Sequence, residues 1–200
     1  MIYLLEQVFR PAIQALNWVE KYGGVVTKYN DPKTNEAYPI VAYNSDPLCS
    51  ETDVFTPITP DDAFKSVVYW EQNGATRIDS SERRYVAGTA SMRFVAWINP
   101  KKQGVTPAYG LSSIYANDFV SRVNSVQGAT VSSVPITLSV TRASITEVDE
   151  NAVFGQYSYA GKKHLFVQPF EFFAVDFEFT FVVPKNCASL ITIDDPIDCY

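Results

Sequence analysis

Two carboxylates, Asp176 and Glu178, have the residue type and spacing that first suggest chemistry. In a β-strand, residues i and i+2 project from the same face roughly 7 Å apart, and a carboxylate pair at such a separation suits glycoside hydrolysis. The segment around them, "FEFFAVDFEFTFVVP" (residues 170–184), alternates apolar and polar residues. This alternation favours a different interpretation, in which both carboxylates belong to the solvent face of an amphipathic strand.

Other groups that could support catalysis are few. His164 is the only histidine, so a zinc site would need carboxylates alone around it. The nucleophile-elbow, dinucleotide-binding and P-loop motifs are absent from the sequence. Asp194, Asp195 and Asp198 lack the spacing of a calcium loop and are interpreted as solvated. We therefore expect no catalytic residue, no metal site and no cofactor.

Composition limits the class of protein. The 200 residues are 46% hydrophobic and 19% charged, which is typical of a globular chain. The net charge of −6 argues against a broad nucleic-acid-binding surface, and no apolar run reaches the ~18 residues of a membrane span. The start lacks the pattern of a secretion signal. Three cysteines, Cys49, Cys187 and Cys199, suggest free thiols in a reducing cytoplasm, with a Cys187–Cys199 disulfide left open.

The chain begins with a helical pattern and continues mainly with strand patterns. The helical stripe consists of Ile2, Leu5, Phe9, Ile13, Leu16 and Val19. We expect a kink or a break at Pro11 and an end at Gly23-Gly24. A second helix is predicted over residues 113–127, with Ile114, Phe119, Val120, Val123 and Val126 on its apolar side.

Period-two alternation predicts strands over residues 25–29, 37–43, 84–100, 135–149 and 173–183, with a short strand over 156–160. Asn73-Gly74 predicts a tight hairpin turn within residues 66–78. Because Phe170 and Phe172 are out of phase with the later phenylalanines, we expect a bulge near Phe172-Phe173. The later phenylalanines are interpreted as core that packs under the N-terminal helix.

These elements predict one α+β domain over residues 1–200. Its mostly antiparallel, twisted sheet would carry the N-terminal helix and the second helix on one face, with long loops. Residues 44–62, which contain three prolines, are predicted to be a long interaction loop. Residues 185–200 form an acidic C-terminal tail.

Paired basic residues at expected strand ends suggest contacts between subunits. Solubilising loop charges are the simpler interpretation, and the alternative is that these residues meet acidic loops of a neighbouring subunit, where charge pairs set register. Lys162-Lys163 is a further basic pair of this kind. The candidate interface residues are Arg83, Arg84, Lys101, Lys102, Glu51, Asp53, Asp61 and Asp62.

The order of these segments resembles a known family. The segments are "EQVFRPAIQALNWV", "AYPIVAY", "SVVYWEQNG", "RRYVAGTASMRFVAWINPKK" and "FEFFAVDFEFTFVV". Over about residues 1–185 they look like the tail-terminator and tail-completion proteins of tailed bacteriophages, including neck-ring (head–tail connector) proteins. The loop over residues 44–62 and the second helix are larger than the minimal family plan, which suggests elaboration or a different position in the neck.

The resemblance implies a structural role in the virion rather than an enzyme. It implies a ring of six or twelve copies around the DNA channel, in contact with neck, tail and portal proteins, with DNA passing through without sequence-specific binding and with no membrane partner. The alternative is a β-rich, adhesin-like glycan- or protein-binding module that uses Trp70, Trp97 and tyrosines, although Trp18 and Trp97 are more economically core residues. A small hydrolase using His164 or Asp176 is a third class.

Overall fold

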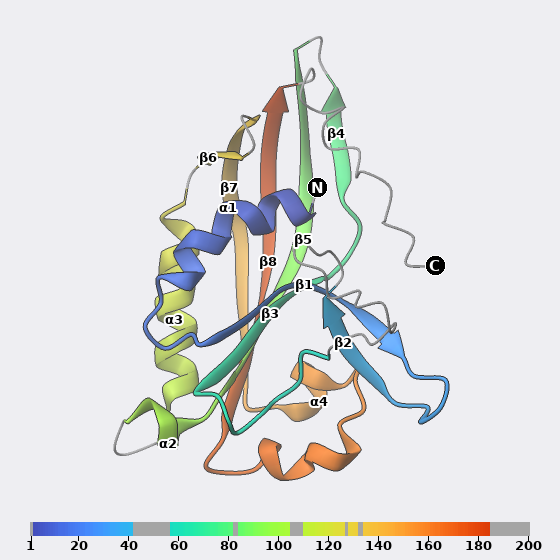
Figure 1. The fold of residues 1–200 in the computed structure, drawn as a ribbon. Coiled ribbons are helices and arrows are strands. Elements are labelled where there is room, and N and C mark those ends of the chain that lie inside the picture. Colours follow the sequence, from blue (N-terminus) through green and yellow to red (C-terminus); the bar gives the residue numbers. More distant parts are fainter. Residues whose placement is uncertain are drawn as a thin grey trace.

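The computed structural model describes residues 2–41, 57–81, 84–104, 110–126, 128–131 and 134–184 (Figure 1). Its helices are α1 (Ile2–Gln14), α2 (Pro100–Gln103), α3 (Leu111–Asn124), α4 (Glu150–Phe154) and the 3-10 helix η1 (Ala160–Phe166). Its strands are β1 (Lys21–Asn30), β2 (Ala37–Val41), β3 (Ser66–Gln72), β4 (Arg77–Ser81), β5 (Tyr85–Ile98), β6 (Gly128–Val131), β7 (Val134–Glu147) and β8 (Glu171–Pro184).

All eight strands belong to one sheet, in the order β2-β1-β3-β5-β8-β7-β6, with β4 also paired to β5. The β1–β3 pair is parallel and the others are antiparallel. The predicted α+β fold with a mostly antiparallel sheet is therefore confirmed. Strands β5 and β8 pair over their whole lengths, from Tyr85 opposite Pro184 to Ile98 opposite Glu171. This pair is the centre of the sheet (Figure 1).

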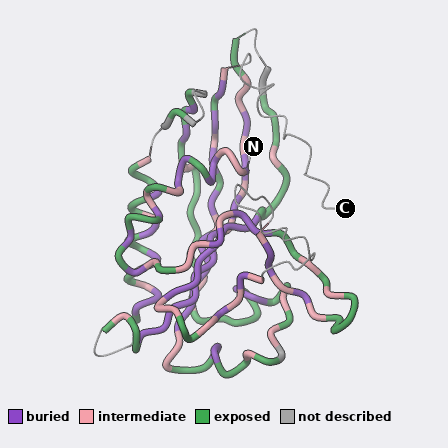
Figure 2. Tube along the Cα trace, viewed as in Figure 1, coloured by how far each residue is buried: buried purple, intermediate pink, exposed green. Residues whose placement is uncertain are grey.

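The main core lies between one face of the sheet and helices α1 and α3. The alternate residues of β8 from Phe173 to Val183 all point into it and are almost fully buried. The ring of Phe179 lies 5.0 Å from that of Phe9 in α1. The interpretation of these phenylalanines as core under the N-terminal helix is confirmed, and Figure 2 shows the buried residues gathered along the central strands.

A second core, which the sequence patterns did not predict, covers the lower part of the opposite face. Helix α4 and η1 pack there against Trp97 and Phe172, with Val153, Phe154, Leu165 and Phe166 buried between them. The short strand predicted over residues 156–160 is wrong, because this segment is a turn that leads into η1. Its tyrosines pack onto the second core instead of pairing with a strand.

The second core also explains why the bulge predicted at Phe172-Phe173 is wrong. Strand β8 keeps an unbroken register with β5, so Phe172 and Phe173 simply face opposite sides of the sheet. Both are buried because each side has its own core at this level. The irregularity lies in β7 instead, where the register with β8 shifts between Val140 and Arg142.

The hairpin predicted at Asn73-Gly74 is also wrong. Gly74 has the expected positive φ of 124°, but β3 and β4 do not pair with each other. Both pair with β5, β3 opposite its second half and β4 opposite Val86–Thr89. The chain therefore continues in the same direction along one edge of β5 after a short interruption, instead of reversing.

The N-terminal helix ends earlier than predicted. Helix α1 runs through Pro11 and stops at Gln14, whereas Gly23 and Gly24 lie inside β1. There Gly24 takes a φ of 66°, and the register between β1 and β3 shifts. In α3 the predicted Phe119 and Val123 are buried, but Ile114 is 61% exposed because it faces away from the sheet.

Candidate functional site

The predicted interface residues fall partly outside the described residues. Glu51, Asp53 and Arg83 cannot be placed for this reason, and the same holds for Cys49, Cys187, Cys199 and the acidic tail. Of the predicted loop over residues 44–62, only residues 57–62 are described. Arg84 is exposed just before β5.

The remaining four interface residues lie in neighbouring segments of one chain. Lys101 and Lys102 are exposed on α2, and Asp62 is exposed nearby. The Lys102 ammonium donates to the carbonyl oxygen of Ala63 (2.7 Å), and the Asn99 amide donates to that of Asp62 (3.2 Å). The Ala63 amide also donates to the Asp61 carboxylate at 2.9 Å. Lys102 and Asp61 therefore make hydrogen bonds within one copy, and contacts of these residues with a neighbouring subunit stay a prediction.

Asp176 is held by an ion pair with Arg93 of β5, the residue opposite it in the register. Two guanidinium nitrogens of Arg93, Nε and Nη2, donate to the two carboxylate oxygens at 2.7 and 2.9 Å. The Asn73 amide donates to the same carboxylate at 2.6 Å. The hydrogen bonds to Asp176 raise the pKa of Arg93. Asp176 is therefore a fixed structural partner, while Glu178 stays exposed on the strand.

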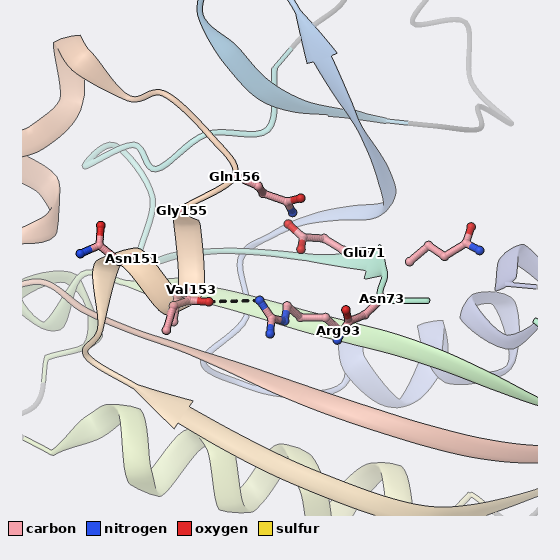
Figure 3. A pocket seen from close by; sticks show the side chains of 9 residues that line it. Glu71, Asn73, Arg93, Asn151, Val153, Gly155 and Gln156 are labelled. Carbon is pink, nitrogen blue, oxygen red and sulfur yellow. Dashed lines mark hydrogen bonds between the residues drawn. The ribbon is translucent and has the colours of Figure 1, made fainter. Parts of the chain in front are cut away.

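Beside this pair is a polar hollow of 160 Å³ between β3, β5 and α4 (Figure 3). Glu71 of β3 is a buried part of its lining and is 5% exposed. The Tyr157 hydroxyl donates to Glu71 Oε1 at 2.7 Å, and Arg93 Nη1 donates to the carbonyl oxygen of Ala152 at 3.1 Å. These contacts connect the α4 segment to the sheet at two points. Glu71, Arg93 and Gln156 converge on the hollow in Figure 3.

Burial raises the pKa of Glu71, and it also raises the pKa of the Tyr157 hydroxyl. A buried carboxyl with a raised pKa can act as a proton donor or acceptor. In this hollow Glu71 accepts a hydrogen bond from Tyr157 of the same chain. The arrangement therefore holds the α4 segment against the sheet. Glu71 was not among the residues predicted from the sequence. The signal for it was an acidic residue at an inward-facing position of the run "SVVYWEQ".

Replacing Glu71 with glutamine is expected to remove a pH-dependent part of the stability. Because the folded-state pKa of Glu71 lies above the ordinary value of 4.5, the folded protein binds this proton more tightly than the unfolded chain. The stability from Glu71 is therefore fully present below pH 4.5 and is lost as the pH rises through the folded-state pKa. The limiting slope is about 1.4 kcal/mol per pH unit.

Urea denaturation of wild type and Glu71→Gln at several pH values between 4 and 8 measures this effect. We expect the free energy of unfolding of wild type, minus that of the variant, to fall as the pH rises. A difference that does not change with pH would show that the carboxyl is not held in a buried, proton-binding site. Other carboxyls, such as Asp31, contribute to the stability with the opposite pH dependence, because the hydrogen bond from the Lys33 backbone lowers the pKa of Asp31. These carboxyls are present in both proteins, so their contribution cancels when the variant is subtracted from wild type.

Other polar candidates are accounted for by local contacts. His164 is exposed in η1. A second buried carboxylate, Glu6, accepts hydrogen bonds from Arg10 at 2.8 and 2.9 Å and from the Tyr22 hydroxyl. Within the described ranges, no group of three or more His, Cys, Asp or Glu residues is placed to hold a metal ion.

Comparison with known proteins gives no family for this chain. No protein-family model and no curated protein matches the sequence. None of the helices among the described residues is long and apolar enough to cross a membrane.

Proposed function

We propose that the protein is a structural subunit of a tailed-bacteriophage virion. It would form a ring in the neck or tail, as a tail terminator or head–tail connector, around the channel through which DNA passes. The α+β fold agrees with the element order on which the resemblance to those proteins is based. Portal, neck and tail proteins would be its neighbours above and below the ring.

The observation that carries the proposal is that, among the described residues, the sheet has an unpaired strand edge on each of its two sides, at β4 and at residues 138–147 of β7. A closed ring uses a heterologous interface, so each copy must present two different surfaces. The outer edges of β4 and of β7 are two such surfaces, on opposite sides of the sheet. Strand β4 lies at the upper end of the long strands, whereas the unpaired stretch of β7 begins below β6 and reaches down to the level of α4 (Figure 1).

The edge at β2 is a poorer candidate for the same role, because the chain itself covers it. The carbonyl oxygen of Pro39 accepts a hydrogen bond from the Ile58 amide (2.8 Å), and that of Ala37 accepts one from the Ser158 amide (2.6 Å). Pro39 also has no N–H to offer another strand. The net charge of −6 suits a channel from which DNA is repelled rather than bound.

The glycan-binding alternative gains no support from the tryptophans. Trp18, Trp70 and Trp97 are 4%, 0% and 1% exposed. The indole N–H of Trp97 donates to the carbonyl oxygen of Leu165, and that of Trp18 donates to the Asp118 carboxylate. Their faces are packed in the cores and cannot stack on a sugar, so Trp97 and Trp18 are core contacts as predicted.

The purified protein is expected to assemble into closed rings of six or twelve copies. Light scattering coupled to size-exclusion chromatography gives the mass, and negative-stain electron microscopy gives the shape. The measurement should cover a range of protein concentrations, since ring closure depends on mass action. A monomer at every concentration, or a twofold dimer without further assembly, would contradict the proposal.

A further inference from the structure

Most of the outer edge of β7 has no strand partner among the described residues. Strand β6 pairs with β7 only from Val134 to Thr137. Among the described residues, no strand or backbone hydrogen bond occupies that side of β7 over residues 138–147, a length of roughly 33 Å. Native edges are usually protected by proline, lysine or a short length. Within residues 138–146 of β7, the features of this kind are Arg142 and the irregularity beside it.

The outer edge of β4 is open in the same way. Strand β4 pairs with β5 through Arg77, Ile78, Ser80 and Ser81, and in the described ranges no hydrogen bond reaches its other side. Ile78 is 54% exposed there, and Asp79 beside it is exposed. An exposed isoleucine and unpaired backbone groups on one strand are the features of a surface that another strand covers.

We propose that the β7 edge of one copy pairs with the β4 edge of the next copy, so that the sheet continues around the ring. This inference rests on the proposed function and specifies its interface. Because β4–β5, β5–β8 and β8–β7 are all antiparallel, β4 and β7 run in opposite directions. A β4 strand placed beside β7 by sheet continuation is therefore antiparallel to it, the pairing that neighbouring strands make most readily.

The side chains on the two edges match face by face. Ile78 lies opposite Gly88 on the main-core side of the sheet. Ala143 and Ile145 lie opposite Phe177 and Val175 on that same side, and Ile145 is 37% exposed. Continuing the sheet keeps the faces aligned, so these apolar side chains become cross-strand neighbours. Apolar cross-strand pairs of this kind stabilise a sheet.

Charge favours this pairing over the pairing of two β7 edges. Arg142 and Asp79 are both exposed, and neither makes an ion pair or a side-chain hydrogen bond to another described residue. Two β7 edges that meet antiparallel bring Arg142 close to its own copy near the centre of the free stretch, and like charges facing each other are destabilising. With β4 as the partner, Arg142 meets Asp79 instead.

The register that joins these two charges also has a geometric consequence. Through β5 and β8, Asp79 lies level with Thr137 and Leu138 of its own β7, above Arg142. Each copy must therefore shift along the strands by roughly 12 Å relative to its neighbour, over a four-strand width of roughly 19 Å. Such a stagger tilts the strands by roughly 30°, close to the tilt that closed sheets require.

A charge exchange tests the pairing. Asp79→Arg and Arg142→Asp are each expected to raise the protein concentration at half-assembly by about tenfold or more, because each places like charges opposite each other. The double variant Asp79→Arg/Arg142→Asp restores opposite charges and should assemble within about threefold of wild type. Lys33→Asp changes the net charge as Arg142→Asp does but lies in the exposed turn between β1 and β2, so it should assemble like wild type.

The outcomes separate the interface from the function. If wild type forms rings and the single variants assemble equally well, or the double variant is no better than the singles, the β4–β7 pairing is wrong while the ring subunit stands. If wild type stays monomeric, both are wrong. Recovery in the double variant also shows that the single variants had not simply failed to fold.

Discussion

Replacing Trp70 with alanine is expected to lower the free energy of unfolding by about 3–5 kcal/mol, the usual cost of removing a large aromatic side chain from a core. Trp70 is 0% exposed. Its ring lies 5.2 Å from that of Phe94, 5.7 Å from Phe119 and 5.9 Å from both Phe9 and Phe177. This one side chain therefore packs β3 against α1, α3, β5 and β8. Its truncation leaves a cavity at the centre of the main core.

Chemical denaturation monitored by far-ultraviolet circular dichroism measures this loss. Ile114→Ala is the matched control, because Ile114 is apolar but 61% exposed, and it should change the stability by less than about 0.5 kcal/mol. A Trp70→Ala variant as stable as this control would mean that the tryptophan does not occupy the main core.

Replacing Gly88 with alanine is expected to cost about 3 kcal/mol and to separate β4 from β5. A Cβ atom on Gly88 would lie 2.2 Å from the carbonyl oxygen of Arg77 and 2.8 Å from Cζ of Phe181. The first neighbour is backbone of the adjacent strand and the second is a fully buried ring, so neither can move away cheaply. Overpacking of this kind destabilises by about 1–3 kcal/mol, sometimes more.

Gly161→Ala is the control for this substitution, because a Cβ atom there meets no atom within 4 Å, and it should be close to neutral. Hydrogen exchange gives the local readout. Amides of Arg77–Ser81 should lose protection in Gly88→Ala while those of β8 keep most of theirs. If Gly88→Ala were as stable as the control, with β4 still protected, the close approach of β4 to β5 at Gly88 would be contradicted. Since β4 carries the proposed interface, the variant should also assemble poorly.

The alternation of apolar and polar residues predicted the long strands, because it depends only on residues close together in the sequence. A strand buried on one side shows its period directly in the side chains, and the residues from Phe173 to Val183 alternate without interruption. The same rule located β5 and β7 and, with period 3.6, most of α1 and α3. It also identified Asp176 as a residue on the outer side of its strand, although its partner Arg93, 83 positions earlier in the chain, had no local signal.

The sequence patterns alone were enough to identify the main elements and the face that each long strand buries, because those features depend on neighbours a few residues away. Tertiary structure alone decided which strand β4 pairs with, that a second core buries Phe172, and that Glu71 lies beside Tyr157 and Arg93. These features depend on which distant segments satisfy a given edge or cover a given face. The backbone of β4 offers the same hydrogen bonds to β3 as to β5, so the choice between them rests on how the whole sheet packs.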